Sequence, residues 1–273
     1  MSIIWKGILS KLNVELLNSR AIYRLKNDFV LNDIVGREIK ITFQNNIECT
    51  ACGKSIKKTY GDGVCFNCLS SLASCDICIV KPELCHFDQG TCRDEEWGKK
   101  NCFAPHIVYL SYTSGIKVGI TRKSQVPTRW IDQGATYAIP IFEVATRKIA
   151  GEIEQIFAKN LNDKTNWRKM LIDQNIDVNM SNERDVIFDL MSDELDFIEE
   201  QYIGEVDFLE NDQIDIKYPV MTYPEKVTST NFDKVKEIEG KLIGIKGQYL
   251  ISNDWVINLR RHSGYQVEIK LRN

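Results

Sequence analysis

Apolar residues alternate with polar ones, or gather in β-branched runs, along most of the chain, and these patterns predict strands. The predicted strands are residues 34–43, 107–111, 116–120, 139–144, 241–251, 255–260 and 265–271. Because only Thr113-Ser114-Gly115 separates two of these runs, residues 107–120 are expected to form a hairpin. A weak likeness between the runs that begin at Ile34 and Leu242 indicates that N- and C-terminal strands share one sheet.

Apolar residues at three- and four-residue spacings predict the helices. The predicted helices are residues 128–133, 148–161 and 186–203. In the second of these, Ile149, Ile153 and Phe157 share one buried face. We therefore expect an α+β fold with N-terminal strands, a zinc-ribbon-like cysteine module, a central α/β module, an acidic helix and a small C-terminal β-sheet.

The length of 273 residues exceeds one typical domain of roughly 150 residues. Hydrophobic residues make up 43% and charged residues 27% of the chain, which is ordinary globular composition. We expect an N-terminal β segment with a zinc-binding module in residues 1–104. A central module is expected in residues 105–180, and the acidic helix with the C-terminal β module in residues 181–273.

No apolar stretch approaches the eighteen residues that a membrane-spanning helix needs, so no membrane partner is expected. The first residues lack the basic and apolar regions of a secretory signal, and we expect a reducing cytoplasmic location. All nine cysteines lie between Cys49 and Cys102. In a reducing compartment this crowding favours metal thiolates over disulfides.

The formal net charge is −3, which does not indicate a general attraction to nucleic acid. The charges are unevenly distributed, however. Residues 97–131 contain six basic and no acidic residues, whereas residues 183–215 contain thirteen acidic residues and one basic. The basic segment suggests a phosphate-facing patch, and the acidic run is typical of a solvated helix face.

Cys49-Thr-Ala-Cys52 and Cys65-Phe-Asn-Cys68 are two pairs of cysteines, each with two residues between its members. Each pair can direct two sulfurs at one ion, and zinc prefers four such ligands in a tetrahedron. These four cysteines therefore predict a structural zinc site, with free reactive thiols as the alternative. A closed four-thiolate site leaves no position for a substrate, so catalysis must be sought elsewhere.

A second zinc site is expected from the remaining cysteines and one histidine, so the chain would hold one or two zinc ions. The candidate ligands are Cys75, Cys78, Cys85, His86, Cys92 and Cys102. Spacing alone does not decide which four bind, and some of these cysteines could instead be buried small hydrophobic residues.

The central region resembles the GIY-YIG nuclease superfamily, in which two short strands carry the namesake motifs and an Arg, a helix Glu and an Asn follow. The matching residues are Val108-Tyr109-Leu110, Lys117-Val-Gly119, Arg129, Glu154 and Asn166. The chain also resembles, from about residue 35 to its end, a bacterial family of unknown function. That likeness rests on the cysteine pairs and on segments such as Pro82-Glu-Leu-Cys-His86 and Arg129-Trp-Ile-Asp-Gln-Gly134.

The nuclease resemblance implies a role for each matching residue. Tyr109 would organise the attacking water or the phosphate, and Arg129 would neutralise the phosphodiester. Glu154 would hold a single Mg²⁺ or Mn²⁺ as the catalytic cofactor. Asn166 would be the late Asn of the family.

Two positions depart from the family pattern. Ile107 stands where the first motif has Gly, and Lys117 stands where the second motif has Tyr, a favoured general base. Lys117 could bind phosphate as a point charge, or act as a base if its pKa were depressed.

Structural roles compete with these assignments. Tyr109 could be a core aromatic residue, and Asn166 could cap a helix that begins near Trp167. Basic and aromatic residues on the C-terminal strands, such as Arg260 and Trp255, could bind single-stranded nucleic acid or simply belong to the sheet.

The function predicted from the sequence is that of a zinc-stabilised, GIY-YIG-like metal-dependent endonuclease that hydrolyses phosphodiester bonds of DNA or RNA. The alternative is a non-catalytic nucleic-acid-binding protein or a zinc-scaffolded interaction protein.

Overall fold

The structure is a computed structural model that describes residues 2–161, 166–172 and 177–272. Helices and antiparallel strands are mixed along the chain, which confirms the α+β fold class with N-terminal strands, a cysteine cluster and a small C-terminal sheet. The N-terminal strands are β1 (Ser2–Ile8), β2 (Asn13–Leu17), β3 (Arg20–Leu25), β4 (Phe29–Val30) and β5 (Glu38–Ile47). The later strands are β6 (His106–Tyr112), β7 (Ile116–Arg122), β8 (Tyr137–Val144), β9 (Val206–Phe208), β10 (Ile214–Asp215), β11 (Glu237–Lys246), β12 (Tyr249–Ser252), β13 (Val256–Asn258) and β14 (Tyr265–Leu271).

The largest sheet in the described part of the chain joins both ends of the sequence. Its six strands lie in the order β1-β14-β5-β11-β12-β13. β5 pairs with both β11 and β14, so the predicted sharing of one sheet by N- and C-terminal strands is confirmed. The alternating burial along β5 follows its alternating sequence, because successive side chains point to opposite faces of a sheet. β2, β3 and β4 form a small separate sheet beside it.

The central sheet contains the predicted hairpin. β6 and β7 are antiparallel neighbours, β8 lies on the other side of β6, and the short strands β9 and β10 pair with β8. β6 is almost fully buried, because the sheet is covered on one face by helices and on the other by the large core. This arrangement places the hairpin residues where they can contact α3 and α4.

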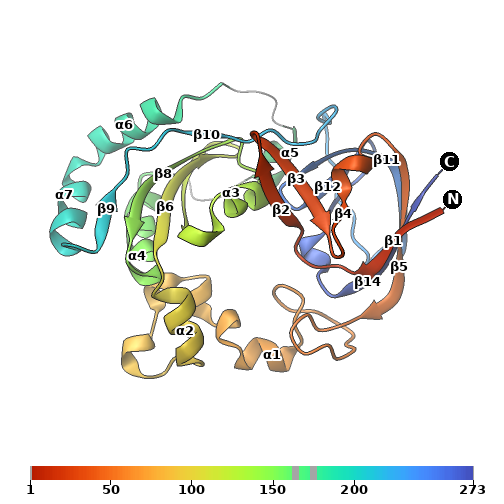
Figure 1. Cartoon of the computed structure of the whole chain (residues 1–273), viewed down its shortest axis with the longest axis horizontal. Coiled ribbons are helices and arrows are strands. Elements are labelled where there is room, and N and C mark those ends of the chain that lie inside the picture. Colours follow the sequence, from red (N-terminus) through yellow and green to blue (C-terminus); the bar gives the residue numbers. More distant parts are fainter. Residues whose placement is uncertain (1, 162–165, 173–176, 273) are drawn as a thin grey trace.

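The helices flank these sheets. They are α1 (Phe66–Ser71), α2 (Glu95–Cys102), α3 (Thr128–Gln133), α4 (Arg147–Ala158), α5 (Trp167–Ile172), α6 (Met180–Leu190) and α7 (Ser192–Gln201). Figure 1 shows α6 and α7 along the outer side of the central sheet, and α3 between the central sheet and the strands of the N-terminal half. Trp130 and Ile131 of α3 belong to the large core, so α3 links the two regions.

Two predicted elements are divided in the structure. The run 241–251 is a hairpin of β11 and β12, because Gly247 takes a positive φ of 60° and turns the chain. The run 186–203 forms two helices, which separate at the non-helical Met191. Ile187 and Ile198 still pack into the same core, which explains why the helical spacing continues across the break.

The cysteine-rich segment follows one side of the molecule from β5 to β6, as Figure 1 shows in orange and yellow. It is built from α1, α2 and several single 3₁₀ turns, among them η3 (Ile77–Ile79), η4 (Pro82–Leu84) and η5 (Phe87–Gln89). The domain boundaries after residues 104 and 180 stay predictions.

Candidate functional site

Cys49, Cys52, Cys65 and Cys68 come together as the sequence predicts. Their sulfur atoms all lie within 4.8 Å of one another, and the sulfurs of Cys52 and Cys65 are 4.0 Å apart. A tetrahedral zinc site with Zn–S bonds of about 2.3 Å places its sulfurs about 3.8 Å apart. Gly53, directly after the first pair, has a φ of 71° that permits the tight turn there. The geometry therefore fits a structural zinc ion.

Backbone amides point at these sulfurs and stabilise their charge. The N–H groups of Cys52 and Cys65 donate to the sulfur of Cys49 at 3.5 and 3.2 Å. Burial by itself raises the pKa of Cys49, but these donors and the N–H of Ala51 outweigh it and lower the pKa to about 6. Hydrogen bonding with Cys65 and burial raise the pKa of Cys68 to about 12. Four thiolates at this spacing would need a cation between them, and zinc suits this ligand set.

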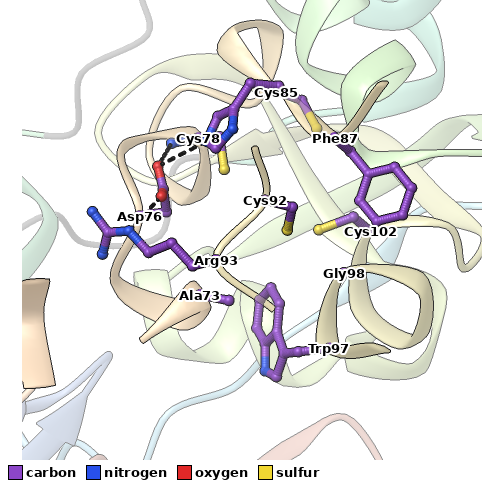
Figure 2. A pocket seen from close by; sticks show the side chains of 11 residues that line it. Ala73, Asp76, Cys78, Cys85, Phe87, Cys92, Arg93, Trp97, Gly98 and Cys102 are labelled. Atoms are coloured by element: carbon purple, nitrogen blue, oxygen red, sulfur yellow. Dashed lines mark hydrogen bonds and ion pairs between the residues drawn. The ribbon is translucent and has the colours of Figure 1, made fainter. Parts of the chain in front are cut away.

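The other five cysteines do not all meet. Cys78, Cys85, Cys92 and Cys102 line one small, partly open cavity (Figure 2), and His86 also belongs to its lining. Cys75 is not among the residues that line this cavity, and its sulfur lies 4.0 Å from the hydroxyl of Ser74. A second group of potential ligand atoms, from Asp76, Cys78 and His86, lies at one edge of the cavity.

Tyr109 lies at the centre of a polar cluster on the central sheet. Its ring is fully buried, its hydroxyl donates to the side-chain oxygen of Gln133 at 3.0 Å, and Trp130 meets it edge-on at 5.6 Å. Burial raises the pKa of Tyr109 to about 12, and the guanidinium of Arg129 opposes this shift from within hydrogen-bonding reach. Tyr109 is thus both a core residue and a contact of Arg129.

Glu154, on α4, lies half-buried among cationic side chains. Burial raises the pKa of its carboxyl group to about 7, although the charges of Arg129, Arg147 and Lys117 act to lower it. Tyr109, Lys117, Arg129 and Glu154 therefore share one neighbourhood, which we call the polar cluster. Glu152 is directed elsewhere, as the helix geometry predicts, and accepts a hydrogen bond from the hydroxyl of Tyr202 at 2.8 Å.

Asn166 caps the N-terminus of α5, which was the structural alternative to a role in the nuclease site. Its side-chain oxygen accepts hydrogen bonds from the backbone N–H groups of Arg168 and Lys169 at 3.1 and 3.2 Å. Its own N–H donates to the hydroxyl of Ser114, in the hairpin turn, at 3.0 Å. Asn166 therefore positions α5 against the hairpin turn.

Sequence reasoning did not identify three residues of this neighbourhood, namely Glu83, Gln133 and Arg147. Glu83, on η4, is a second carboxylate whose charge raises the pKa of Glu154. Arg147 precedes Glu154 by seven residues, or two helical turns, and this spacing could have revealed it. No sequence signal places Glu83 there, because its position depends on the path of the cysteine-rich segment.

The aromatic residues of the C-terminal strands are packed inside the fold. Trp255 and Tyr265 are buried, and Tyr249 stacks on Trp167 with ring centres 5.6 Å apart. Trp255 and Tyr265 therefore serve as structural residues of the fold, and Tyr249 is half-buried against Trp167.

Gly119→Ala is expected to destabilise the protein by about 1–3 kcal/mol, because a Cβ at this position would meet the Tyr109 ring at 2.7 Å. Urea denaturation measures this difference. Combining Gly119→Ala with Tyr109→Leu should cost little more than Tyr109→Leu alone. If the two losses in the free energy of unfolding simply add, the Tyr109 ring is not what a side chain at position 119 collides with.

Most of the chain matches a known protein family. The family described as "Protein of unknown function (DUF2797)" matches residues 36–267. The chain belongs to this family. The matched range contains the four-cysteine cluster, the second cysteine cavity and the polar cluster, and it confirms the predicted membership of a family of unknown function. No curated protein and no solved structure matches the chain.

No helix within the described residues is both long and apolar enough to cross a membrane.

Proposed function

We propose that the protein is a zinc-stabilised, metal-dependent nuclease that hydrolyses phosphodiester bonds of DNA or RNA at the polar cluster. The observation that carries this proposal is the position of Glu154, a half-buried carboxylate that faces the charges of Arg129, Arg147 and Lys117. Anionic and cationic groups held close together in a partly buried site can bind a metal ion and a phosphate side by side.

The residues of the polar cluster then have separate tasks. Glu154 holds Mg²⁺ or Mn²⁺, and such an ion, when bound, neutralises charge on the phosphate oxygens. Arg129 binds the phosphodiester through its planar guanidinium. Tyr109 stays protonated near neutral pH, since its pKa is about 12, and orients Arg129 through their contact. Lys117 provides a positive charge where the nuclease superfamily has Tyr.

Basic residues continue from Arg129 toward the C-terminal region. The pKa of Asp62 is held below its usual range by Arg260 and, at greater distance, by Lys11 and Arg129. The guanidinium of Arg260 donates hydrogen bonds to both carboxylate oxygens of Asp62, at 2.9 and 2.7 Å. This grouping of Lys11, Arg129 and Arg260 supports a path for a nucleic-acid backbone that leads to the polar cluster.

Nucleic-acid affinity should fall steeply between about 50 and 200 mM salt, because each phosphate contact releases counterions. Fluorescence anisotropy with labelled DNA and RNA measures it. Arg260→Ala should reduce the salt slope by about one, whereas Arg272→Ala, at the far end of β14, should leave it unchanged. Undetectable binding at low salt would favour a zinc-scaffolded interaction protein, and binding without cleavage would favour a non-catalytic nucleic-acid-binding protein.

Glu154→Gln is expected to stabilise the protein at alkaline pH. The folded-state pKa of about 7 exceeds the ordinary value of 4.5, so the unfolded chain loses this proton first and wild-type stability falls as the pH rises from about 4.5 to 7. Glutamine removes this loss, giving up to about 3 kcal/mol at pH 8 and no difference near pH 4.5. Urea unfolding of zinc-loaded protein without Mg²⁺ measures the effect, and parallel pH profiles would contradict it.

We propose that this activity belongs to the cytoplasm, because none of the nine cysteines, which all lie within the described residues, forms a disulfide and thiolate zinc sites suit a reducing compartment.

A further inference from the structure

We propose that Cys78, Cys85, Cys92 and Cys102 bind a second structural zinc ion, behind the helix that carries Glu154. The four residues come from four separate parts of the cysteine-rich segment, at η3, after η4, after η5 and at the end of α2. All four line a small, partly open cavity of about 20 Å³. A space of this size holds a single small species, because one water-sized sphere occupies about 10–15 Å³.

Four cysteines contribute to the cavity wall. Figure 2 shows the sulfurs of Cys92 and Cys102 facing each other across the space, with Cys78 and Cys85 on its other sides. Gly98 lies against the cavity, where a Cβ would approach the Cys92 sulfur to 3.3 Å. The four sulfurs are not gathered within 4.8 Å as those of Cys49, Cys52, Cys65 and Cys68 are. Cys85 and Cys92 lie outside the short turns, so zinc binding would draw these two thiols inward to the spacing of about 3.8 Å that zinc imposes.

The nearby Asp76 and His86 belong to the wall of the site and are not its ligands. The Asp76 carboxylate is already paired with the Nε of Arg93 at 2.7 Å and accepts from the Cys78 N–H at 3.4 Å. His86 uses Nδ1 for a 2.8 Å hydrogen bond with Thr91, and its Nε2 faces Asp76 at 3.5 Å. Both ring nitrogens and both carboxylate oxygens are thus engaged. This network fixes the loops that carry Cys78, Cys85 and Cys92.

The second zinc site supports α4 and, through it, the polar cluster. Arg147 of α4 donates to the carbonyl oxygen of Ile79 at 2.6 Å, directly after Cys78. Pro82 of η4 packs on Gly151 so closely that a Cβ there would lie 2.5 Å from the proline ring. Since Glu154 is one helical turn beyond Gly151, zinc at this site holds the backbone against which Glu154 is placed.

Zinc content per chain tests this proposal without reference to nuclease activity. Elemental analysis of wild-type protein should give two zinc ions, and Cys85→Ser and Cys92→Ser should each give one. Cys75→Ser is the matched control and should retain two, because Cys75 is outside the cavity lining. His86→Gln should also retain two. One zinc ion in the wild type, or loss of zinc from His86→Gln but not from Cys92→Ser, would overturn the assignment.

X-ray absorption at the zinc edge of wild-type protein needs no variant and covers the case in which Cys85→Ser or Cys92→Ser does not fold. Four sulfur neighbours per zinc at about 2.3 Å are expected on average. Nitrogen or oxygen neighbours in place of sulfur would assign the site to Asp76, Cys78 and His86 and refute the proposal. Two all-sulfur zinc ions in a protein that cleaves no nucleic acid would refute the proposed function alone.

Discussion

Cys52→Ser is expected to release one zinc ion and unfold the segment between Cys49 and Cys68. Between Cys49 and Cys68 the regular structure is limited to isolated bridges and the start of α1, and Val64 is the main buried apolar side chain, so bound zinc would supply most of the stability of this segment. The binding free energy of a structural zinc ion is largely folding free energy, about 10–16 kcal/mol in zinc-finger peptides. Elemental analysis together with amide hydrogen exchange measures both losses.

Cys75→Ser is the matched control for this experiment, because it removes one thiol from the wider cysteine-rich segment between β5 and β6 without touching either sulfur cluster. It should leave zinc content and hydrogen exchange unchanged. Full zinc content in Cys52→Ser, or amide protection of residues 49–68 that persists after chelation, would show that the four thiols do not hold this segment folded through zinc.

Glu154→Gln is expected to abolish phosphodiester cleavage while nucleic-acid affinity changes little. Removing the carboxylate removes the anchor for Mg²⁺ or Mn²⁺, a loss on the order of 10³-fold in rate. Most binding energy comes from Lys and Arg contacts to other phosphates and is kept. Arg129→Ala should weaken both affinity and rate, because its charge serves the bound substrate and the transition state alike.

Glu152→Gln is the matched control for Glu154→Gln. It makes the same chemical change on the same helix, and glutamine can still accept the hydrogen bond from Tyr202. Its cleavage rate should stay within a few-fold of the wild type. Equal rate losses in the two variants would indicate a general effect of changing α4, and the polar cluster would lose its assigned role.

Short spacings in the sequence predicted the first cysteine cluster, whereas the residues of the polar cluster were proposed from the resemblance to the GIY-YIG superfamily. The cysteine pairs each place two ligands within four residues, and the hairpin puts Tyr109 opposite Gly119 by strand pairing alone. Glu154 was separable from Glu152 by helix geometry. Backbone periodicity fixes these relations between neighbouring residues, but it does not assign the residues a function, which only the resemblance implies.

Other features depend on contacts between distant segments. The charge of Glu83 acts on Glu154 only because η4 packs on α4, although the two residues are about seventy positions apart in the sequence. The choice of Cys85 over Cys75 for the second cavity likewise follows from the loop path and not from spacing. The sequence predicted one helix for residues 186–203, because the apolar spacing continues unchanged across the break at Met191.

The most direct test of the central claim is the single-turnover cleavage rate of wild-type protein and Glu154→Gln, measured side by side on labelled single-stranded, duplex and branched DNA and RNA. With Mg²⁺ or Mn²⁺ present, the account predicts cleavage of at least one substrate by the wild type and a loss on the order of 10³-fold in Glu154→Gln. Cleavage at equal rates by both proteins, or cleavage by neither, would contradict it.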